Sequence, residues 1–233
     1  MTDVGMAVSR TNLQTEQNPS EILLVDSRRL VRAGIERILC DSGYLTVSGH
    51  ATSCDDAIRL ARKRLPRIIL LNLPGSKVDV LDGTRKIRRQ FPDVQVLVFT
   101  DEEDLIIQDR LLQAGVAGCI SGFCSVDELF IAIETVLQGE RYISDSMARK
   151  LAERRLPGQA ISPFDELTHR ELQILLLVAE GKSTTVIARE LCLTQKTVNG
   201  YRNRLLEKLR ATTEVGLMHL AIRYGLVRIP QCS

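Results

Sequence analysis

The chain has 233 residues and a formal net charge of +2, and 44% of its residues are hydrophobic and 26% charged. This composition is ordinary for a soluble protein with a packed core, and the length predicts one large domain or two smaller ones. No run of 18 apolar residues occurs, so the sequence excludes a typical membrane-spanning helix.

The first twenty residues are polar and lack the basic-then-apolar order of a secretory signal. We expect this head to be disordered, and we expect a cytoplasmic protein without contact to a membrane. Six cysteines occur without a CxxC pair and with only three histidines, which is not the spacing of a zinc site. The sequence therefore predicts buried, reduced thiols, no metal site and no cofactor.

Residues 21–139 alternate between short apolar runs and segments with helical periodicity. The apolar runs have the length of strands, and they begin at Glu21, Tyr44, Arg67, Val94 and Val116. The last helical segment opens with a capping-box pair, Ser125 and Glu128. Five alternations of this kind predict a doubly wound α/β domain, with a parallel sheet covered by helices on both faces.

Residues 140–163 interrupt this pattern with charges, prolines and glycines. They are predicted to form a linker that contains a helix around "DSMARKLAERRL", residues 145–156. Residues 164–229 then contain helical patterns only.

In this last part the sequence predicts one helix opened by a capping box in "LTHRE" and ending at Gly181. A second helix is predicted from Ser183 to Leu191. After the tight turn "CLT", a third begins at Gln195 and is N-capped by Thr194. This succession is typical of a helix-turn-helix.

The third helix carries two stripes at helical spacing. One is apolar and is expected to pack, and the other is expected to face outward. The outward residues are Lys196, Asn199, Gly200 and Asn203. Amide and cationic side chains read base edges in the major groove of DNA. Glycine inside a helix costs about 1 kcal/mol relative to alanine, so Gly200 either permits close approach of DNA or is a flaw of the helix.

A second group of residues is expected to meet DNA phosphates, which give affinity and register without sequence information. These residues are Lys182, Thr194, Thr197, Arg202, Arg204 and Lys208. From Phe164 onward the chain has ten Lys and Arg against seven Asp and Glu, a weakly basic balance. A charge run is often only a solvated face, but the turn and the asparagine stripe beside it favour DNA.

The segment from Leu167 to Leu209 resembles the LuxR-type DNA-binding domain nearly throughout. The resemblance implies a fourth helix at about 213–224 that forms a dimer contact, and a two-fold dimer would read an inverted repeat in double-stranded DNA. The apolar face of that helix would serve either a partner helix or the core of its own domain. Its residues are Val215, Leu217, Met218, Ala221 and Ile222.

The α/β half resembles a response-regulator receiver, and the two halves together resemble the bacterial NarL/FixJ family. The motifs "LVRAGIERIL", "LLQAGVAG" and "QGERYIS" are most similar to the GacA/UvrY branch. The resemblance implies a strand-end aspartate that accepts a phosphoryl group and two acidic residues after the first strand that help hold Mg²⁺. It also implies a Ser or Thr at the end of the fourth strand and a lysine at the end of the fifth.

Matched to that pattern, this chain is predicted to have a degenerate phosphorylation pocket. Asp26 remains as one acid and Thr100 as the hydroxyl. Ser27 stands at the second acidic position, Asn72 replaces the nucleophile and Gly122 replaces the lysine. An amide has no anionic oxygen to attack phosphorus, and one carboxylate should hold Mg²⁺ poorly. As ordinary polar residues, Asn72 would bond nearby backbone and Thr100 would cap the next helix.

The leading hypothesis is a homodimeric, DNA-binding transcription regulator, not an enzyme, that acts without aspartyl phosphorylation and uses its receiver-like domain for dimerisation or docking. The alternative is an interaction protein that heterodimerises with a true response regulator or binds a sensor kinase or small ligand. A third reading is a phosphorelay receiver with another acceptor, such as Asp26 or Ser76. A redox pair of Cys119 and Cys124 is conceivable, but burial is the expected state of both.

Overall fold

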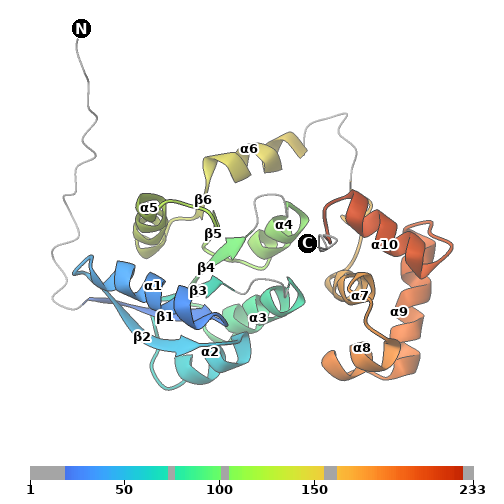
Figure 1. Cartoon of the computed structure of the whole chain (residues 1–233), viewed down its shortest axis with the longest axis horizontal. Helices are drawn as coiled ribbons and strands as arrows, with labels where there is room; N and C mark the ends of the chain where they lie inside the picture. Colours follow the sequence, from blue (N-terminus) through green and yellow to red (C-terminus); the bar gives the residue numbers. More distant parts are fainter. Residues whose placement is uncertain (1–18, 73–76, 101–104, 155–161, 228–233) are drawn as a thin grey trace, which may run out of the picture.

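The computed structural model describes residues 19–72, 77–100, 105–154 and 162–227 (Figure 1). Its parallel sheet has the strand order β2-β1-β3-β4-β5-β6. The strands are β1 Ser20–Asp26, β2 Leu45–Ala51, β3 Ile68–Asn72, β4 Gln95–Thr100, β5 Gly118–Ser121 and β6 Tyr142–Ile143. The disorder expected of residues 1–20 falls almost wholly outside the described residues, and Ser20 is already the first residue of β1.

Helices cover the sheet on both faces, as predicted for a doubly wound domain. They are α1 Arg29–Cys40, α2 Cys54–Ala61, α3 Lys77–Gln90, α4 Leu105–Gln113 and α5 Val126–Leu137. One face is packed by α1 and α5, through Leu39 and Ile133. The other face is packed by α2, α3 and α4, with Leu81 and Leu111 among the fully buried side chains. Strands buried on both faces read as continuous apolar runs, which is why "IILL" in β3 shows no alternation.

The sheet continues into the segment expected to be a linker. β6 pairs in parallel with β5, with Tyr142 opposite Gly118. A Cβ atom at Gly118 would lie 2.5 Å from the carbonyl oxygen of Tyr142, so this pairing depends on glycine there. The expected helix follows as α6, Asp145–Arg154, and contacts α4 through the fully buried Met147. The segment predicted as a linker with a helix therefore also contributes a strand, β6, to the sheet.

The C-terminal part contains the four predicted helices. They are α7 His169–Ala179, α8 Thr184–Glu190, α9 Gln195–Lys208 and α10 Glu214–Arg223. Thr168 and Glu171 form a complete capping box at α7, and Thr194 caps α9 by accepting from the backbone of Thr197. None of the helices in the described parts of the chain is long and apolar enough to cross a bilayer.

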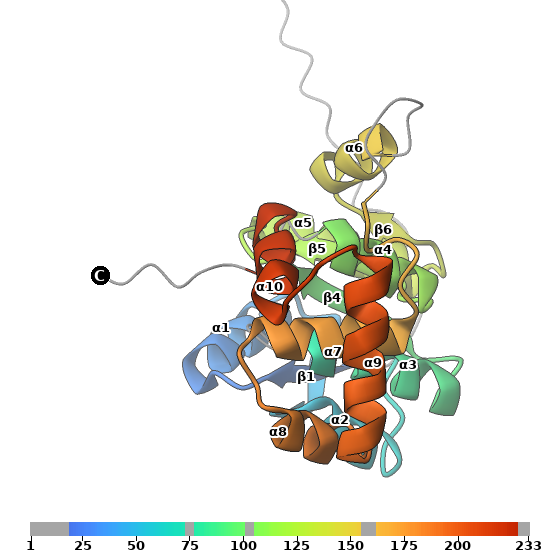
Figure 2. The same ribbon diagram turned by 90° about the vertical axis from the view of Figure 1, so that its right-hand side faces the viewer.

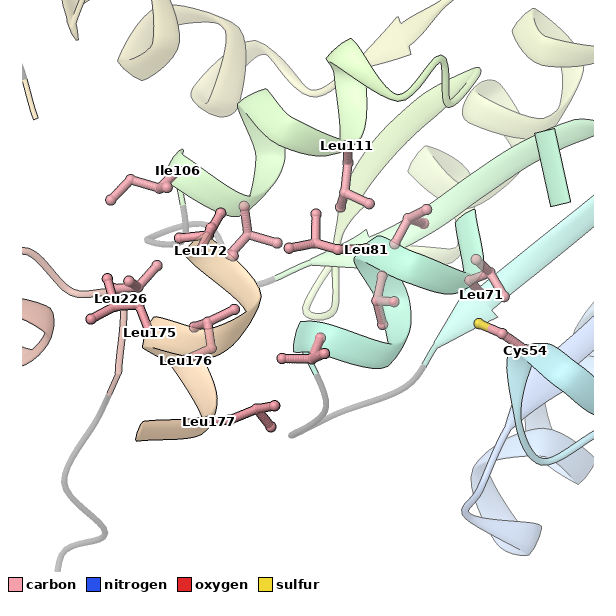
Figure 3. Packing of buried hydrophobic residues seen from close by; sticks show 14 of the residues in the cluster. Cys54, Leu71, Leu81, Ile106, Leu111, Leu172, Leu175, Leu176, Leu177 and Leu226 are labelled. Carbon is pink, nitrogen blue, oxygen red and sulfur yellow. The ribbon is translucent and has the colours of Figure 1, made fainter. Parts of the chain in front are cut away.

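The two halves share one hydrophobic core, because α7 packs against α3 of the α/β domain. All residues of α7 from Glu171 to Ala179 are buried. Its leucines lie beside the apolar side chains of α3 and α4, with Leu172 facing Leu81 and Leu111 (Figure 3). A helix that is apolar on all sides is stable only when neighbours cover each side, so α7 requires both the receiver domain and the other C-terminal helices.

Polar contacts frame this interface. Arg110 of α4 donates from Nη2 to three carbonyl oxygens just before α7, those of Phe164 at 3.0 Å, Asp165 at 3.2 Å and Leu167 at 2.6 Å. Lys77, the first residue of α3, donates to the carbonyl oxygen of Leu226 at 2.8 Å.

His169, at the start of α7, lies in the interface with Nε2 3.9 Å from Oδ1 of Asp82. Burial, followed by nearby arginines, lowers its pKa to about 4 despite Asp82. A neutral imidazole therefore sits at the interface at neutral pH.

Replacing Arg110 by methionine should loosen the docked C-terminal domain. The change removes three charge-assisted hydrogen bonds and keeps most of the aliphatic side chain, and bonds of this kind contribute about 1.5–3 kcal/mol. We expect faster amide hydrogen exchange in α7 and in the preceding turn. Arg89→Met, which removes an exposed arginine of α3, should leave that exchange unchanged. Equal exchange in the two variants would contradict a role of Arg110 in docking.

Candidate functional site

The predicted recognition helix α9 lies on the side of the molecule away from the receiver domain. Figure 2 shows α9 in front, with α7 between it and the sheet. Lys196, Asn199 and Asn203 are exposed, while Val198 and Leu205 of the opposite stripe are fully buried. The two stripes therefore divide as predicted, and the outward stripe is accessible while the two domains are packed together.

Gly200 occupies the outward stripe without a structural need for glycine. A Cβ atom built there meets no atom within 4 Å. Packing within the chain therefore does not explain this residue. Because glycine has no side chain, nothing projects from α9 at this position between Asn199 and Asn203.

The residues expected to contact phosphates do not form one group. Thr194 and Thr197 lie at the start of α9, and their hydroxyl oxygens are 2.8 Å apart. Arg204 is exposed and its guanidinium lies 4.6 Å from the ring centre of Tyr201. Lys182 is held by Glu190 at 2.9 Å and by Glu180. Thr194, Thr197 and Arg204 thus remain accessible to a phosphate, whereas Lys182 already has anionic partners.

Two of the residues predicted to contact phosphates form ion pairs with other helices of the C-terminal domain. Arg202 has a side chain that is only 14% exposed, and it bonds Glu214 of α10 at 3.0 Å and Thr184 of α8 at 2.6 Å. Lys208 bonds the carboxylate of Glu171 at 2.9 Å, and that carboxylate is 3% exposed. Each cation therefore links α9 to another helix of its own domain, and phosphate contact by Arg202 and Lys208 stays a prediction.

Sequence reasoning missed two polar residues at the edge of this surface, Gln195 and Thr184. Gln195, the first residue of α9, is exposed and donates from Nε2 to the hydroxyl of Thr185 at 3.2 Å. Asn199 accepts a hydrogen bond from Thr184 at 3.4 Å. The position of Gln195 beside Lys196 at the N-terminal end of the third helix was the signal that could have pointed to it.

The apolar face of α10 serves mainly the core of its own domain. Leu217 and Ala221 are fully buried against α7, so the expectation that they form a dimer contact is corrected. Val215 is 59% exposed, and Met218 and Ile222 are partly exposed. These three residues are the part of the predicted dimer surface that remains accessible.

The predicted phosphorylation pocket lies at the carboxyl edge of the sheet, where β1 and β3 end side by side. Asp26 and Asn72 are opposite each other in register, and Nδ2 of Asn72 donates to Oδ2 of Asp26 at 2.7 Å. The prediction that Asn72 bonds nearby backbone is therefore wrong, because its amide donates to a side chain. An amide beside a carboxylate must present its NH₂ group, because two acceptor oxygens would repel each other.

The carboxylate of Asp26 is fully buried and is surrounded by donors. Oδ1 accepts from the backbone N–H of Arg28 at 2.7 Å and from its Nε at 3.2 Å. Oδ2 accepts from Nη2 of Arg28 at 3.0 Å and from Asn72. Arg32 donates to the carbonyl oxygen of Asp26. Hydrogen bonding to Asp26 raises the pKa of Arg28 above its ordinary value, although burial opposes this.

Among the described residues, no charged partner is placed at the other three pocket residues, Thr100, Ser27 and Gly122. The hydroxyl of Thr100 lies 3.5 Å from the carbonyl oxygen of Ile120 and 3.8 Å from the sulfur of Met147. Its expected role as a helix cap concerns residues 101–104, which lie outside the described residues. Ser27 is exposed. A Cβ atom at Gly122 meets nothing within 4 Å, so packing does not exclude a larger side chain there.

These donors do not fit the Mg²⁺ ion that the receiver resemblance implies. Mg²⁺ takes oxygen ligands in octahedral geometry at about 2.0–2.1 Å. Both oxygens of Asp26 already accept two hydrogen bonds each. Asn72 points its N–H group at the same place, and Ser27 brings no charge. Within the described ranges, no group of three or more His, Cys, Asp or Glu side chains is placed to hold a metal ion.

Other acceptors have little support in the geometry. The carboxylate of Asp26 is inaccessible, and Ser76 lies outside the described residues.

Cys119 is fully buried, and burial raises its pKa to about 12. Burial, with Glu128 nearby, also raises the pKa of Cys124. Both thiols are therefore protonated at neutral pH, which opposes a reactive redox pair.

The fold and these two sites define a response regulator, a receiver domain joined to a helix-turn-helix domain. The response regulator receiver domain family matches residues 22–134, and the luxR family of bacterial regulatory proteins matches residues 165–221. The chain is 41% identical over 208 residues to the response regulator GacA of Pseudomonas aeruginosa, covering 89% of this chain and 97% of that protein. It is 38% identical over 206 residues to the response regulator UvrY of Escherichia coli, covering 88% and 94%.

The chain therefore belongs to the response regulators that carry a luxR-type domain, a class of transcription regulators. Among solved structures, the RcsB response regulator of Salmonella typhimurium superposes with a TM-score of 0.69 at 22% identity, over 91% of this chain and all of that one. A structure of an RcsB–DNA complex superposes with a TM-score of 0.55 at 23% identity, over 87% and 98%. These similarities confirm the α/β and helical architecture.

Replacing Lys208 by methionine should destabilise the chain rather than remove a DNA contact. The change leaves the buried Glu171 carboxylate without its cation, which typically costs about 3 kcal/mol. We expect a lower urea midpoint and a salt dependence of DNA binding that is unchanged, whereas loss of a phosphate contact would reduce the slope by about 0.9.

The double variant Lys208→Met/Glu171→Gln is the matched control, because it removes the buried charge as well. It should recover most of the lost stability. A reduced salt slope at unchanged stability would instead identify Lys208 as a phosphate ligand.

Proposed function

We propose that this chain is a transcription regulator, and not an enzyme, that binds double-stranded DNA through α9 as a homodimer and needs no phosphoryl group on its receiver domain. The observation that carries the proposal is the outward position of α9 while the two domains are packed together. No domain separation is required before the Lys and Asn stripe of α9 reaches a major groove.

The pocket supports the second half of the proposal. Receiver domains that accept phosphoryl groups use a carboxylate nucleophile at the end of the third strand, and Asn72 has no anionic oxygen there. Ser27 and Gly122 remove two further charges at positions that act together with it. The proposal is supported by the donor set around Asp26, which does not match the usual metal arrangement. An unmodified protein is therefore the active form in this proposal.

Base readout is assigned to Lys196, Asn199 and Asn203, with Gly200 between them. Thr194, Thr197 and Arg204 are assigned to the phosphates at the groove edge. The exposed remainder of α10, Val215, Met218 and Ile222, is proposed as the contact of a two-fold dimer, which would read an inverted repeat. A solved structure of RcsB, a fold relative, is described as bound to DNA, which supports this use of the fold.

Selection of genomic DNA fragments by purified, untreated full-length protein tests the proposal. We expect enrichment of an inverted repeat, and we expect Lys196→Ala/Asn199→Ala to lose it, with specific binding weaker by at least about 30-fold because the two base contacts contribute about 1–3 kcal/mol each. Lys63→Ala removes the same charge from an exposed receiver residue and should keep the enrichment.

The same selection after treatment with acetyl phosphate and Mg²⁺ tests independence from phosphorylation. Intact mass should show no phosphoryl adduct, and the enriched sequences should be unchanged. Enrichment that appears only after treatment, together with an adduct, would overturn the proposed mechanism. Absence of enrichment in both cases would overturn DNA selection by the homodimer.

A second function, docking to another response regulator or to a sensor kinase, is favoured by exposed apolar residues on the receiver domain. Phe123 is 92% exposed and Leu30 is 85% exposed. Both follow strands at the carboxyl edge of the sheet, at the starts of the helices that pack on the same sheet face. Isolated apolar residues on surfaces are common, but side chains this exposed at the pocket edge suit a protein partner.

Sedimentation of this chain with a purified response regulator of the same organism tests that second function. A heterodimer should form with the unchanged protein and weaken by at least about tenfold with Leu30→Ser/Phe123→Ser. Leu65→Ser, which alters an exposed apolar residue elsewhere on the receiver domain, is the control. Equal association of all three proteins would exclude this surface.

A further inference from the structure

We infer that the guanidinium group of Arg28 takes the place of a divalent cation beside Asp26, so that this receiver domain is closed to Mg²⁺ for as long as Arg28 is present. This inference rests on the proposed regulation without phosphoryl transfer, and it identifies the residue that maintains it. Metal binding, rather than DNA binding, is the quantity that tests it.

The first step of the argument concerns charge. The side chain of Asp26 is completely buried, and a buried carboxylate is stable only when it is paired and hydrogen-bonded. Arg28 supplies both requirements with a planar, two-point contact, from Nε to Oδ1 and from Nη2 to Oδ2. This fork geometry is the strongest common pairing of a carboxylate with a side chain.

The second step concerns lone pairs. The two oxygens of Asp26 together accept four hydrogen bonds, three of them from Arg28 and one from Asn72. A carboxylate offers about four lone-pair positions. A metal ion therefore has to displace a donor from Asp26, and two of the four hydrogen bonds come from the permanently charged guanidinium of Arg28.

The third step explains why Asn72 and Arg28 belong together. Asn72 lies 2.7 Å from Asp26 and donates to it. A carboxylate in that place would put two negative charges in contact, which requires a metal ion or a proton between them. The amide removes this requirement, and one arginine then neutralises Asp26, the acid that the chain keeps from the receiver pattern. Restoring an aspartate at position 72 alone would consequently not restore a metal site, because Arg28 would still donate hydrogen bonds to both oxygens of Asp26.

The experiment measures Mg²⁺ binding by calorimetric titration of full-length proteins with MgCl₂ at constant ionic strength. Four proteins are compared: the unchanged chain, Ser27→Asp/Asn72→Asp, and this double variant with either Arg28→Ser or Arg29→Ser added. Arg29 is exposed and adjacent, so its replacement removes the same charge while Arg28 stays beside Asp26.

We expect no saturable binding by the unchanged chain. Adding Arg28→Ser to Ser27→Asp/Asn72→Asp should raise the affinity for Mg²⁺ by at least about tenfold. Adding Arg29→Ser instead should leave the affinity of the double variant unchanged. Equal affinity with and without Arg28, or an equal gain from Arg29→Ser, would overturn the inference. Saturable binding by the unchanged chain would overturn it as well.

Arg28→Ser in the otherwise unchanged chain provides a second measurement if the multiple variants do not fold. It leaves Asp26 without its cation, so its melting temperature should fall and should rise again with MgCl₂ but not with NaCl of equal ionic strength. An equal response of the unchanged chain to MgCl₂ would contradict the inference. Loss of DNA selection by the unchanged chain would instead count against the proposed function and leave these metal measurements valid.

Discussion

The burial of α7 on all sides is the constraint on which the arrangement of the molecule depends. Its residues from Glu171 to Ala179 include seven aliphatic side chains, and all nine are buried. One side of α7 meets α9 and α10, and the other meets α3 of the receiver domain. Exposure of either side would place leucines in water, at about 1.5–3 kcal/mol for each fully buried side chain. Because α7 occupies the space between the domains, α9 is directed outward.

Charged groups inside each domain are neutralised by partners from the same chain. In the C-terminal domain, burial alone would raise the pKa of Glu171, but Lys208 and Thr168 lower it below its ordinary value. In the receiver domain, Arg28 and Asn72 donate hydrogen bonds to the buried carboxylate of Asp26. Lys208 and Arg28 are engaged with buried carboxylates and are therefore less available to a ligand. Lys196 and Arg204 are exposed and do not hold a buried carboxylate among the described residues.

The sequence was sufficient for features that depend on local patterns. Apolar runs ended by turn residues located the five strands that precede helices, and capping residues such as Thr168 and Thr194 located the starts of α7 and α9. The period of 3.6 residues separated the buried stripe of α9 from the exposed one. These signals are local because strand burial, caps and helical faces involve neighbours in the chain.

Features that depend on distant partners do not follow from the sequence. Arg202 and Lys208 have the spacing of groove-facing cations, yet their carboxylate partners belong to α10 and α7. The sequence left open whether Leu217 and Ala221 serve a dimer or the core of their own domain, because their burial against α7 is a tertiary contact. The two residues of β6 are too few to show a period. The role of Arg28 depends on the complete burial of the Asp26 carboxylate, which the sequence alone does not show.

The pocket and the domain interface lie at two elements that follow each other in the chain, β3 and α3. Asn72 ends β3, and α3 begins at Lys77, which bonds the carbonyl oxygen of Leu226 in the C-terminal domain. A change of charge at the end of β3 would therefore act near the start of the helix on which α7 rests. An equilibrium between two arrangements shifts only when a ligand binds one of them better. In the proposed mechanism, the amide at position 72 and the arginine beside Asp26 deprive phosphoryl groups and Mg²⁺ of the contacts that would give them such a preference, so the docked arrangement with α9 outward is set by the packing of α7 and by the hydrogen bonds of Arg110 and Lys77.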